Sequence, residues 1–323
     1  MRKIFLNEFG RLRSGWRVFI FSCAFLAISF LFVMVLRVIY AVLFQVGVVL
    51  RFNVVANLIF HITTLVAALG GGYFCARLLE ALPWRSLGLT FHPRWLRDLL
   101  VGFAVGFAAL AFAVVIATAA GGLRFSFGGA GMIAAIVRSL VASAAILFVG
   151  ALAEEALFRG YPLHTFSRAQ LVGLGVLLTS AVFALAHLTN PNAVPAAMLV
   201  NTTLAGIWLA AAWLRTRSLW FPLGVHWSWN WALGSFFGLP ISGLSLVSNP
   251  LLRGEDLGPA WLTGGSYGIE GGIVSTIAMA VFTLITWRLP WVSATPELKK
   301  LTSEENPVLP SAVVNVRPAD DAV

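Results

Sequence analysis

Residues 139–165 read SLVASAAILFVGALAEEALFRGYPLHT, a long apolar run that ends in two adjacent acids and an arginine. Its first part, 139–153, carries no charge, and similar uncharged runs recur along the 323 residues. Hydrophobic residues make up 59% of the chain and charged residues 11%, whereas about 25% of a typical soluble domain is charged. A single globular core cannot bury this much apolar surface, so the sequence predicts an integral membrane protein.

The apolar runs predict helices. They reach or approach the ~20 residues that span a bilayer. They are also continuously apolar, whereas the strands of a membrane barrel alternate between apolar and polar residues. We therefore expect an all-α, polytopic membrane protein with about eight transmembrane helices. The expected spans are 18–43, 52–76, 99–122, 139–165, 169–189, 196–214, 219–238 and 271–288.

The distribution of charge predicts an orientation. The formal net charge is +9, which in a soluble domain suggests nucleic-acid binding. In a membrane protein it reflects the positive-inside bias instead. With both termini in the cytoplasm, 17 of the 22 Lys and Arg residues lie on the inner side. We expect a multi-pass protein of the plasma membrane with both termini cytoplasmic and no nucleic-acid partner.

Composition also predicts how the chain is organised. Residues 1–137 are expected to hold the N-terminal transmembrane helices and an interfacial loop, and 138–235 a core that carries the chemistry. An external loop and the last transmembrane helix should fill 236–295, and 296–323 should form a disordered cytoplasmic tail. Gly102 and Gly106 should let two helices approach closely. The two cysteines lie in apolar runs and provide neither a disulfide framework nor a cysteine metal site.

Glu154 and Glu155 are the only acids between residues 99 and 254. A charge at mid-membrane costs about 3 kcal/mol on insertion scales, so such residues are functional by default. Glu155 has Arg159 at i+4 and should pair with it. Glu154 has Phe158 at that position and stays available as a general base. The alternative is a buried ion pair that only fixes helix packing.

Two histidines belong to polar clusters on later helices. Phe183 and His187 are four residues apart, and so are His226 and Asn230. A carboxylate with an imidazole can activate water, and an imidazole with a carboxamide can donate hydrogen bonds to an oxyanion. The remaining histidines are expected to make structural hydrogen bonds or to lie at the interface: His61, His92 and His164.

Three motifs together resemble one family. They are E-E-x-x-x-R at 154–159, F-x-x-x-H at 183–187 and H-x-x-x-N at 226–230. Their order is similar to that in the CAAX protease and bacteriocin-processing group of intramembrane proteases, also called Abi, which includes the type II CAAX prenyl endopeptidases. The resemblance covers about residues 138–235. It implies helices that enclose an intramembrane active site open to the cytoplasm.

The resemblance also implies an activity and residue roles. The activity is hydrolysis of peptide bonds in membrane-associated or lipidated (CAAX-type) proteins or in hydrophobic peptides, so the partners are such a substrate and the bilayer. Glu154 is implied as the base, with His187 helping to hold the water, and His226 and Asn230 as the oxyanion site. The implied supporting residues are Glu155, Arg159 and Phe183.

The metal question stays open at this point. We favour a glutamate mechanism without a cofactor, and the helical H-E-x-x-H signature is absent from the sequence. Zinc is the alternative, because a carboxylate and two histidines make a workable ligand set. In that case the ligands would be Glu154, His187 and His226.

Other functions remain as alternatives. The chain could be a non-catalytic bacteriocin self-immunity or scaffold protein, or a transporter that uses Glu154 and Glu155 as a proton relay. Gly264–Gly268 satisfies G-x-S-x-G, but a nucleophile elbow needs a strand-to-helix turn, and a glycine-rich loop is expected here. Glu270 is expected to be an interfacial acid at a helix N-terminus.

For Glu154 and His187 to meet, at least one of their helices must be tilted or interrupted. With straight helices that turn near residue 167, His187 would lie roughly 10 Å too far along for Glu154. The sequence therefore predicts tilt or a helix interruption, at Gly160–Pro162 or at Gly173–Gly175.

Overall fold

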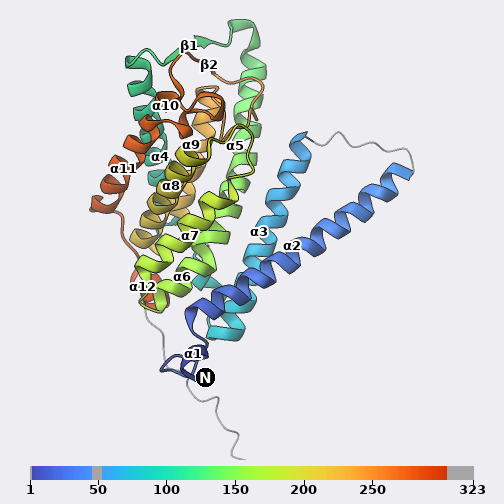
Figure 1. Ribbon diagram of the computed structural model, residues 1–323, viewed down its shortest axis with the longest axis vertical. Helices are drawn as coiled ribbons and strands as arrows, with labels where there is room; N and C mark the ends of the chain where they lie inside the picture. The colour runs from blue at the N-terminus through green and yellow to red at the C-terminus, as the bar shows by residue number, and fades with distance from the viewer. Residues whose placement is uncertain (1, 46–52, 304–323) are drawn as a thin grey trace, which may run out of the picture.

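The computed structural model describes residues 2–45 and 53–303, and most of them are helical (Figure 1). The helices are α1 Arg2–Phe5, α2 Ser14–Gln45, α3 Asn53–Glu80, α4 Trp95–Ala119, α5 Ile133–Glu155, α6 Tyr161–Arg168, α7 Val172–Ala186, α8 Pro195–Thr216, α9 Trp220–Trp231, α10 Ala260–Thr263, α11 Ile273–Arg288 and α12 Pro296–Ser303. The strands are β1 Leu123–Phe127 and β2 Leu252–Asp256. Short 3-10 turns lie at Trp84–Leu87, Ala130–Met132, Gly265–Tyr267 and Ile269–Gly271, and π-turns at Ala156–Gly160 and Ala232–Phe236.

The helices support the prediction of a helical membrane protein. Among the described residues, five segments are long and apolar enough to cross a bilayer: Ser14–Val42, Ala56–Glu80, Trp95–Ala119, Ile133–Arg168 and Ala196–Thr216. Helices α7 and α11 are apolar but shorter. The expected span at 219–238 is occupied by α9 and the π-turn that follows it. The count of eight spans stays a prediction.

The backbone of helix α9 lies directly against the backbone of helix α4. A Cβ atom on Gly102 would lie 2.2 Å from the carbonyl oxygen of Phe221, and one on Gly224 would lie 2.2 Å from that of Leu99. A Cβ on Gly106 would meet the Val225 carbonyl oxygen at the same distance. The expectation that small residues permit close helix approach is confirmed. This contact fixes the depth of α9, and therefore of the side chains it carries.

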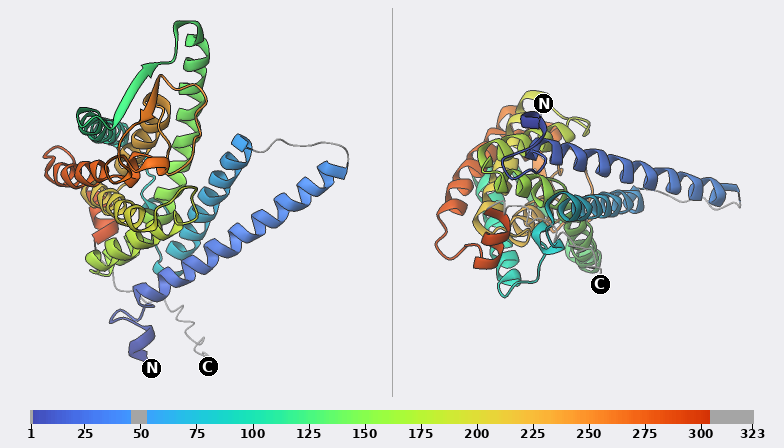
Figure 2. Two further views of the ribbon diagram at one scale, coloured as in Figure 1. Left: turned by 45° about the horizontal axis from the view of Figure 1, so that its top comes forward. Right: turned by 90° about the horizontal axis from the view of Figure 1, so that it is seen from below.

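Helices α2 and α3 lean away from the rest of the bundle (Figures 1 and 2). Most of α2 exposes apolar side chains, which suits contact with lipid tails. Ion pairs connect the N-terminal end of α2 to the C-terminal end of α3. Arg17 of α2 lies 2.8 Å from Glu80 of α3, and both side chains are fully buried. Arg168 of α6 contacts the same carboxylate at 3.3 Å, so three helices meet there.

A two-stranded antiparallel sheet lies at the end of the molecule opposite α1 and α12 (Figure 1). Strand β1 pairs with β2, with Leu123 opposite Asp256 and Phe127 opposite Leu252. The sequence predicted no strand, and it indicated an external loop between residue 236 and the last transmembrane helix. The pairing joins segments that are far apart in sequence, and each strand has only five residues, so local patterning cannot identify it.

The prediction of a disordered tail from residue 296 is wrong for 296–303. Helix α12 docks against α6, and its last carbonyl groups accept hydrogen bonds from buried side chains. Arg168 donates to the Leu301 oxygen at 2.8 Å, and Ser167 donates to the Thr302 oxygen at 3.1 Å. Cationic side chains favour a helix C-terminus. The rest of the expected tail, 304–323, lies outside the described residues.

The predicted orientation can be tested with single cysteines on either side of α11. In a Cys23→Ala/Cys75→Ala background, a membrane-impermeant maleimide should label Ser248→Cys in intact cells. Ser293→Cys should react only after permeabilisation. Both positions are exposed, so burial does not block either reaction. Labelling with the reverse pattern would place the segment after α11 outside and contradict the predicted orientation.

The contact between α4 and α9 predicts that two glycine-to-alanine substitutions differ in their effect on stability. Gly102→Ala should lower the unfolding free energy by about 1–3 kcal/mol or more, because the added methyl group would clash with backbone atoms that cannot move aside. Gly173→Ala is the matched control, since a Cβ atom at that position would have nothing within 4 Å. Thermal unfolding in detergent checks this, and equal melting temperatures for the two variants would contradict it.

Candidate active site

The helix that carries the acidic pair is interrupted directly after it. Helix α5 ends at Glu155, the π-turn Ala156–Gly160 follows, and α6 begins at Tyr161 with Pro162 behind it. A single π-turn inside a helix often marks a functional site. The predicted interruption near Gly160–Pro162 is confirmed, whereas α7 runs without a break through Gly173–Gly175.

Glu155 is fully buried and neutralised by its neighbours. Arg159 donates to its Oε1 at 3.0 Å, which confirms the predicted i, i+4 pair. The other end of the guanidinium donates to the Gly206 carbonyl oxygen at 3.1 Å and so holds α8. His226 Nδ1 lies 2.9 Å from the same carboxylate oxygen. Because a carboxylate accepts, Nδ1 donates, and the other ring nitrogen is directed away from Glu155.

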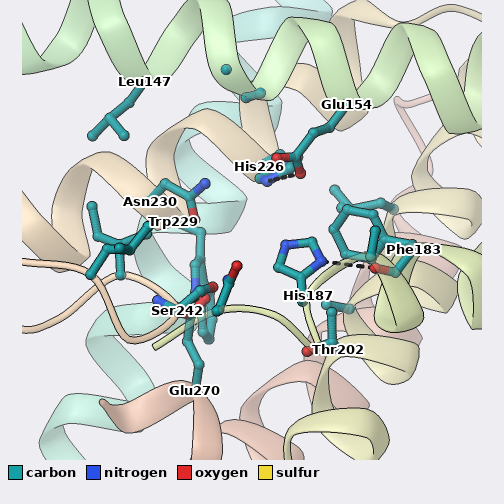
Figure 3. Close-up of a pocket in the computed structure, with 18 of the residues that line it drawn as sticks. Leu147, Glu154, Phe183, His187, Thr202, His226, Trp229, Asn230, Ser242 and Glu270 are labelled. Carbon is teal, nitrogen blue, oxygen red and sulfur yellow. Dashed lines mark hydrogen bonds and ion pairs between the residues drawn. The ribbon is translucent and has the colours of Figure 1, made fainter. Parts of the chain in front are cut away.

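Glu154 faces a cavity of about 340 Å³ instead (Figure 3). Its side chain is 26% exposed, against 0% for Glu155. Its Oε2 lies 3.6 Å from Nε2 of His226 and makes no hydrogen bond within the described part of the chain. One helix end therefore carries a neutralised carboxylate and one that faces open space.

His187 enters the cavity from the end of α7 (Figure 3). Its Nδ1 donates to the Phe183 carbonyl oxygen at 2.8 Å, which leaves Nε2 free to act on a bound molecule. The Phe183 ring packs on His187 at a centroid distance of 4.7 Å and lies 4.8 Å from the Arg159 guanidinium carbon. Phe183 therefore connects the neutralised ion pair to the open side of the site.

The opposite wall of the cavity contains Asn230 and Glu270, an acid that the sequence did not predict to line it. Glu270 accepts a hydrogen bond from Trp229 Nε1 at 2.9 Å, and its second oxygen accepts from the Ser242 backbone and hydroxyl at 2.6 and 3.0 Å. It lies just before α11, as expected, but it also lines the cavity, which the sequence did not predict. Its partners come from α9 and the 240–270 segment, and only the folded chain brings them together.

The cavity thus collects all four side chains for which the sequence predicted chemistry: Glu154, His187, His226 and Asn230. Their pairing differs from the expectation, because Glu154 lies beside His226. In the described ranges no hydrogen bond or ion pair joins it to His187. His61 of α3 also lines the cavity, although the sequence indicated a structural hydrogen bond or an interfacial position for it. His164 is buried at the α12 contact, 3.2 Å from the Leu301 oxygen.

The donor set of the cavity does not match a zinc site. Zinc needs ligands about 2.0–2.2 Å from the ion, so its ligands must lie close together. Among residues 2–45 and 53–303, no three His, Cys, Asp or Glu side chains are grouped closely enough to hold a metal ion. Glu154, His187 and His226 line one cavity, but as arranged they do not fit zinc.

The serine motif has the wrong surroundings for a nucleophile. Ser266 is exposed and sits in the 3-10 turn Gly265–Tyr267, with no strand before it. Burial raises the pKa of the adjacent Tyr267 to about 12, so that phenol stays protonated at neutral pH and cannot serve as a base. The segment acts as a glycine-rich connection, as expected.

These features define a helical membrane protein whose interior cavity combines a free carboxylate, two imidazoles and a carboxamide. A family model described as type II CAAX prenyl endopeptidase Rce1-like matches residues 136–232, which contain all three motifs. The resemblance seen in the motifs is confirmed over this segment. Neither a search of curated proteins nor a search of solved structures gives a match.

The buried ion pair predicts a large effect on stability. Arg159→Gln leaves the Glu155 carboxylate without its strongest partner, and the unfolding free energy should fall by about 3–5 kcal/mol. The double variant Glu155→Gln/Arg159→Gln removes both charges and should recover much of that loss. Thermal unfolding of the purified proteins measures both. If the double variant is no more stable than Arg159→Gln, the charge argument is wrong.

Proposed function

We propose that this protein is an intramembrane endopeptidase that uses Glu154 to activate water. One observation carries the proposal. Glu154 faces the cavity 3.6 Å from His226, while the adjacent Glu155 is neutralised behind it by Arg159 and by His226 itself. An ionic network that only held helices together would not leave the second carboxylate open to a cavity. The match of residues 136–232 to a prenyl endopeptidase family supports the same activity.

The reaction follows from these groups. The Glu154 carboxylate takes a proton from water, and the water oxygen bonds to the carbonyl carbon of the scissile peptide. The carbonyl π electrons move to oxygen, and the resulting oxyanion accepts hydrogen bonds from Asn230 and from the protonated His226 ring. The C–N bond then breaks, and Glu154 returns its proton to the leaving nitrogen. His187 Nε2 accepts a hydrogen bond from the water before attack.

The surroundings of the cavity favour a substrate in the membrane. Helices α3, α5 and α8 contribute to its wall and fall within apolar spans, and many of its lining residues are hydrophobic. Its polar side chains can hydrogen-bond a peptide backbone, and its hydrophobic side chains can contact apolar parts of a substrate. We therefore propose a membrane-associated or lipidated protein, or a hydrophobic peptide, as the substrate class, with a glutamate mechanism that needs no metal.

Glu154→Gln is the direct test. Wild-type protein and the variant, each in liposomes, are given a panel of hydrophobic and S-farnesylated cysteine peptides, and the products are read by mass spectrometry. Wild type should cleave, and the variant should lose at least about 100-fold in rate, because a general base contributes about 10²–10⁴-fold. A parallel reaction with a chelator should proceed at the same rate.

Two controls separate the outcomes. The variant should keep the melting temperature of the wild type, which shows that its fold is intact. Loss of activity with the chelator would replace the metal-free mechanism with a metal-dependent one. Absence of cleavage by both folded proteins would favour the immunity or scaffold role, and proton uptake without cleavage would favour a transporter.

A further inference from the structure

His61 lies against helix α5, one helical turn away from Glu154. Its ring packs on Gly150 of α5, where a Cβ atom would lie 3.2 Å from Nε2 and 3.3 Å from Cε1. Gly150 and Glu154 are four residues apart and share one helix face. The glycine therefore makes room for the imidazole, and α3 delivers this side chain to the wall of the same cavity.

The charges of the site act on this imidazole. Both Glu154 and His226 are near enough to His61 to interact with it electrostatically. The other polar side chains of α3 that line the cavity are the neutral Asn57 and Thr64. Glu154 of α5, which packs against α3, and His226 of α9 are thus the ionisable groups of the site that act on His61.

Two polar atoms in this part of the site match each other chemically. Nδ1 of His61 and Oε2 of Glu154 are both buried, and neither makes a hydrogen bond within the described residues. A buried polar group without a partner destabilises the folded state. Both side chains line the cavity, and an imidazole and a carboxylate are partners that a small hydrogen-bonding molecule can bridge.

We propose that His61 is a further catalytic residue, whose imidazole holds the attacking water together with Glu154. This inference rests on the proposed endopeptidase function. It gives α3, which lies outside the matched segment 136–232, a direct part in the chemistry. The water is then held from the side of α3 by His61 and from α5 by Glu154, while α9 supplies the groups that stabilise the oxyanion.

Substitutions at His61 test the proposal with the farnesylated or hydrophobic peptide that the wild type cleaves fastest. His61→Leu should lower kcat by about tenfold or more and change KM less than about twofold, because the water keeps Glu154 and His187 but loses one of the groups that position it, while the substrate contacts remain. His61→Gln retains a hydrogen-bonding group and should restore part of kcat. Ile62→Ala, on the next position and largely exposed, is the control and should cleave at the wild-type rate.

Gly150→Ala tests the position of the ring without changing the ring itself. The added methyl group pushes the imidazole away by a few tenths of an ångström, so kcat should fall. In a His61→Leu background the same change should have little further effect, because no imidazole remains to be moved. Gly173→Ala is the matched control, with open space around it. Melting temperatures verify that every variant is folded.

The outcomes distinguish the two proposals. If Glu154→Gln is inactive but His61→Leu has the wild-type kcat, His61 is not catalytic and the proposed function stands. If His61→Leu raises KM alone, His61 binds substrate and does not hold water, which overturns the inference. Equal effects of Gly150→Ala with and without His61 would also overturn it. If wild type cleaves no peptide, the proposed function fails and this inference fails with it.

Discussion

The rest of the structure depends on the neutralisation of Glu155 inside the bundle. A carboxylate at this depth is tolerated only with partners, and here they come from its own π-turn through Arg159 and from α9 through His226. The guanidinium in turn holds the Gly206 carbonyl of α8. One buried charge thus fixes three helices relative to one another, and it leaves Glu154 as the acid of the pair that faces the cavity.

The direct backbone contact between α4 and α9 adds a second constraint. The glycines of α4 and α9 allow contact that no side chain could replace, so the level of His226 and Asn230 is set by the helices and not by loops. At the far end, Glu80 with Arg17 and Arg168 ties α2 and α3 to α6. Side chains of α6 also hold the last carbonyl groups of α12. The site is therefore carried by rigid elements, as precise chemistry requires.

The cavity contains more chemistry than the motifs indicate. Glu270 is fixed by Trp229 and Ser242 on one wall, and His61 stands beside Gly150 on another. Asn57, His61 and Thr64 follow one another at i, i+4 and i+7 in an apolar run, so this polar stripe was the signal that could have identified His61. Glu270 has no such stripe, and its partners Trp229 and Ser242 are brought to it only by the fold.

The sequence by itself determined the class of protein, its helical character, the pairing of Glu155 with Arg159 and the four side chains that gather in the cavity. These follow from local physics: apolar length, helical spacing and the cost of charge in lipid. Only the tertiary structure decided that Glu154 lies beside His226, that His61 and Glu270 enter the cavity, that β1 pairs with β2 and that residues 296–303 dock as a helix. Each of these depends on contacts between segments far apart in the chain, and local spacing does not show which segments meet.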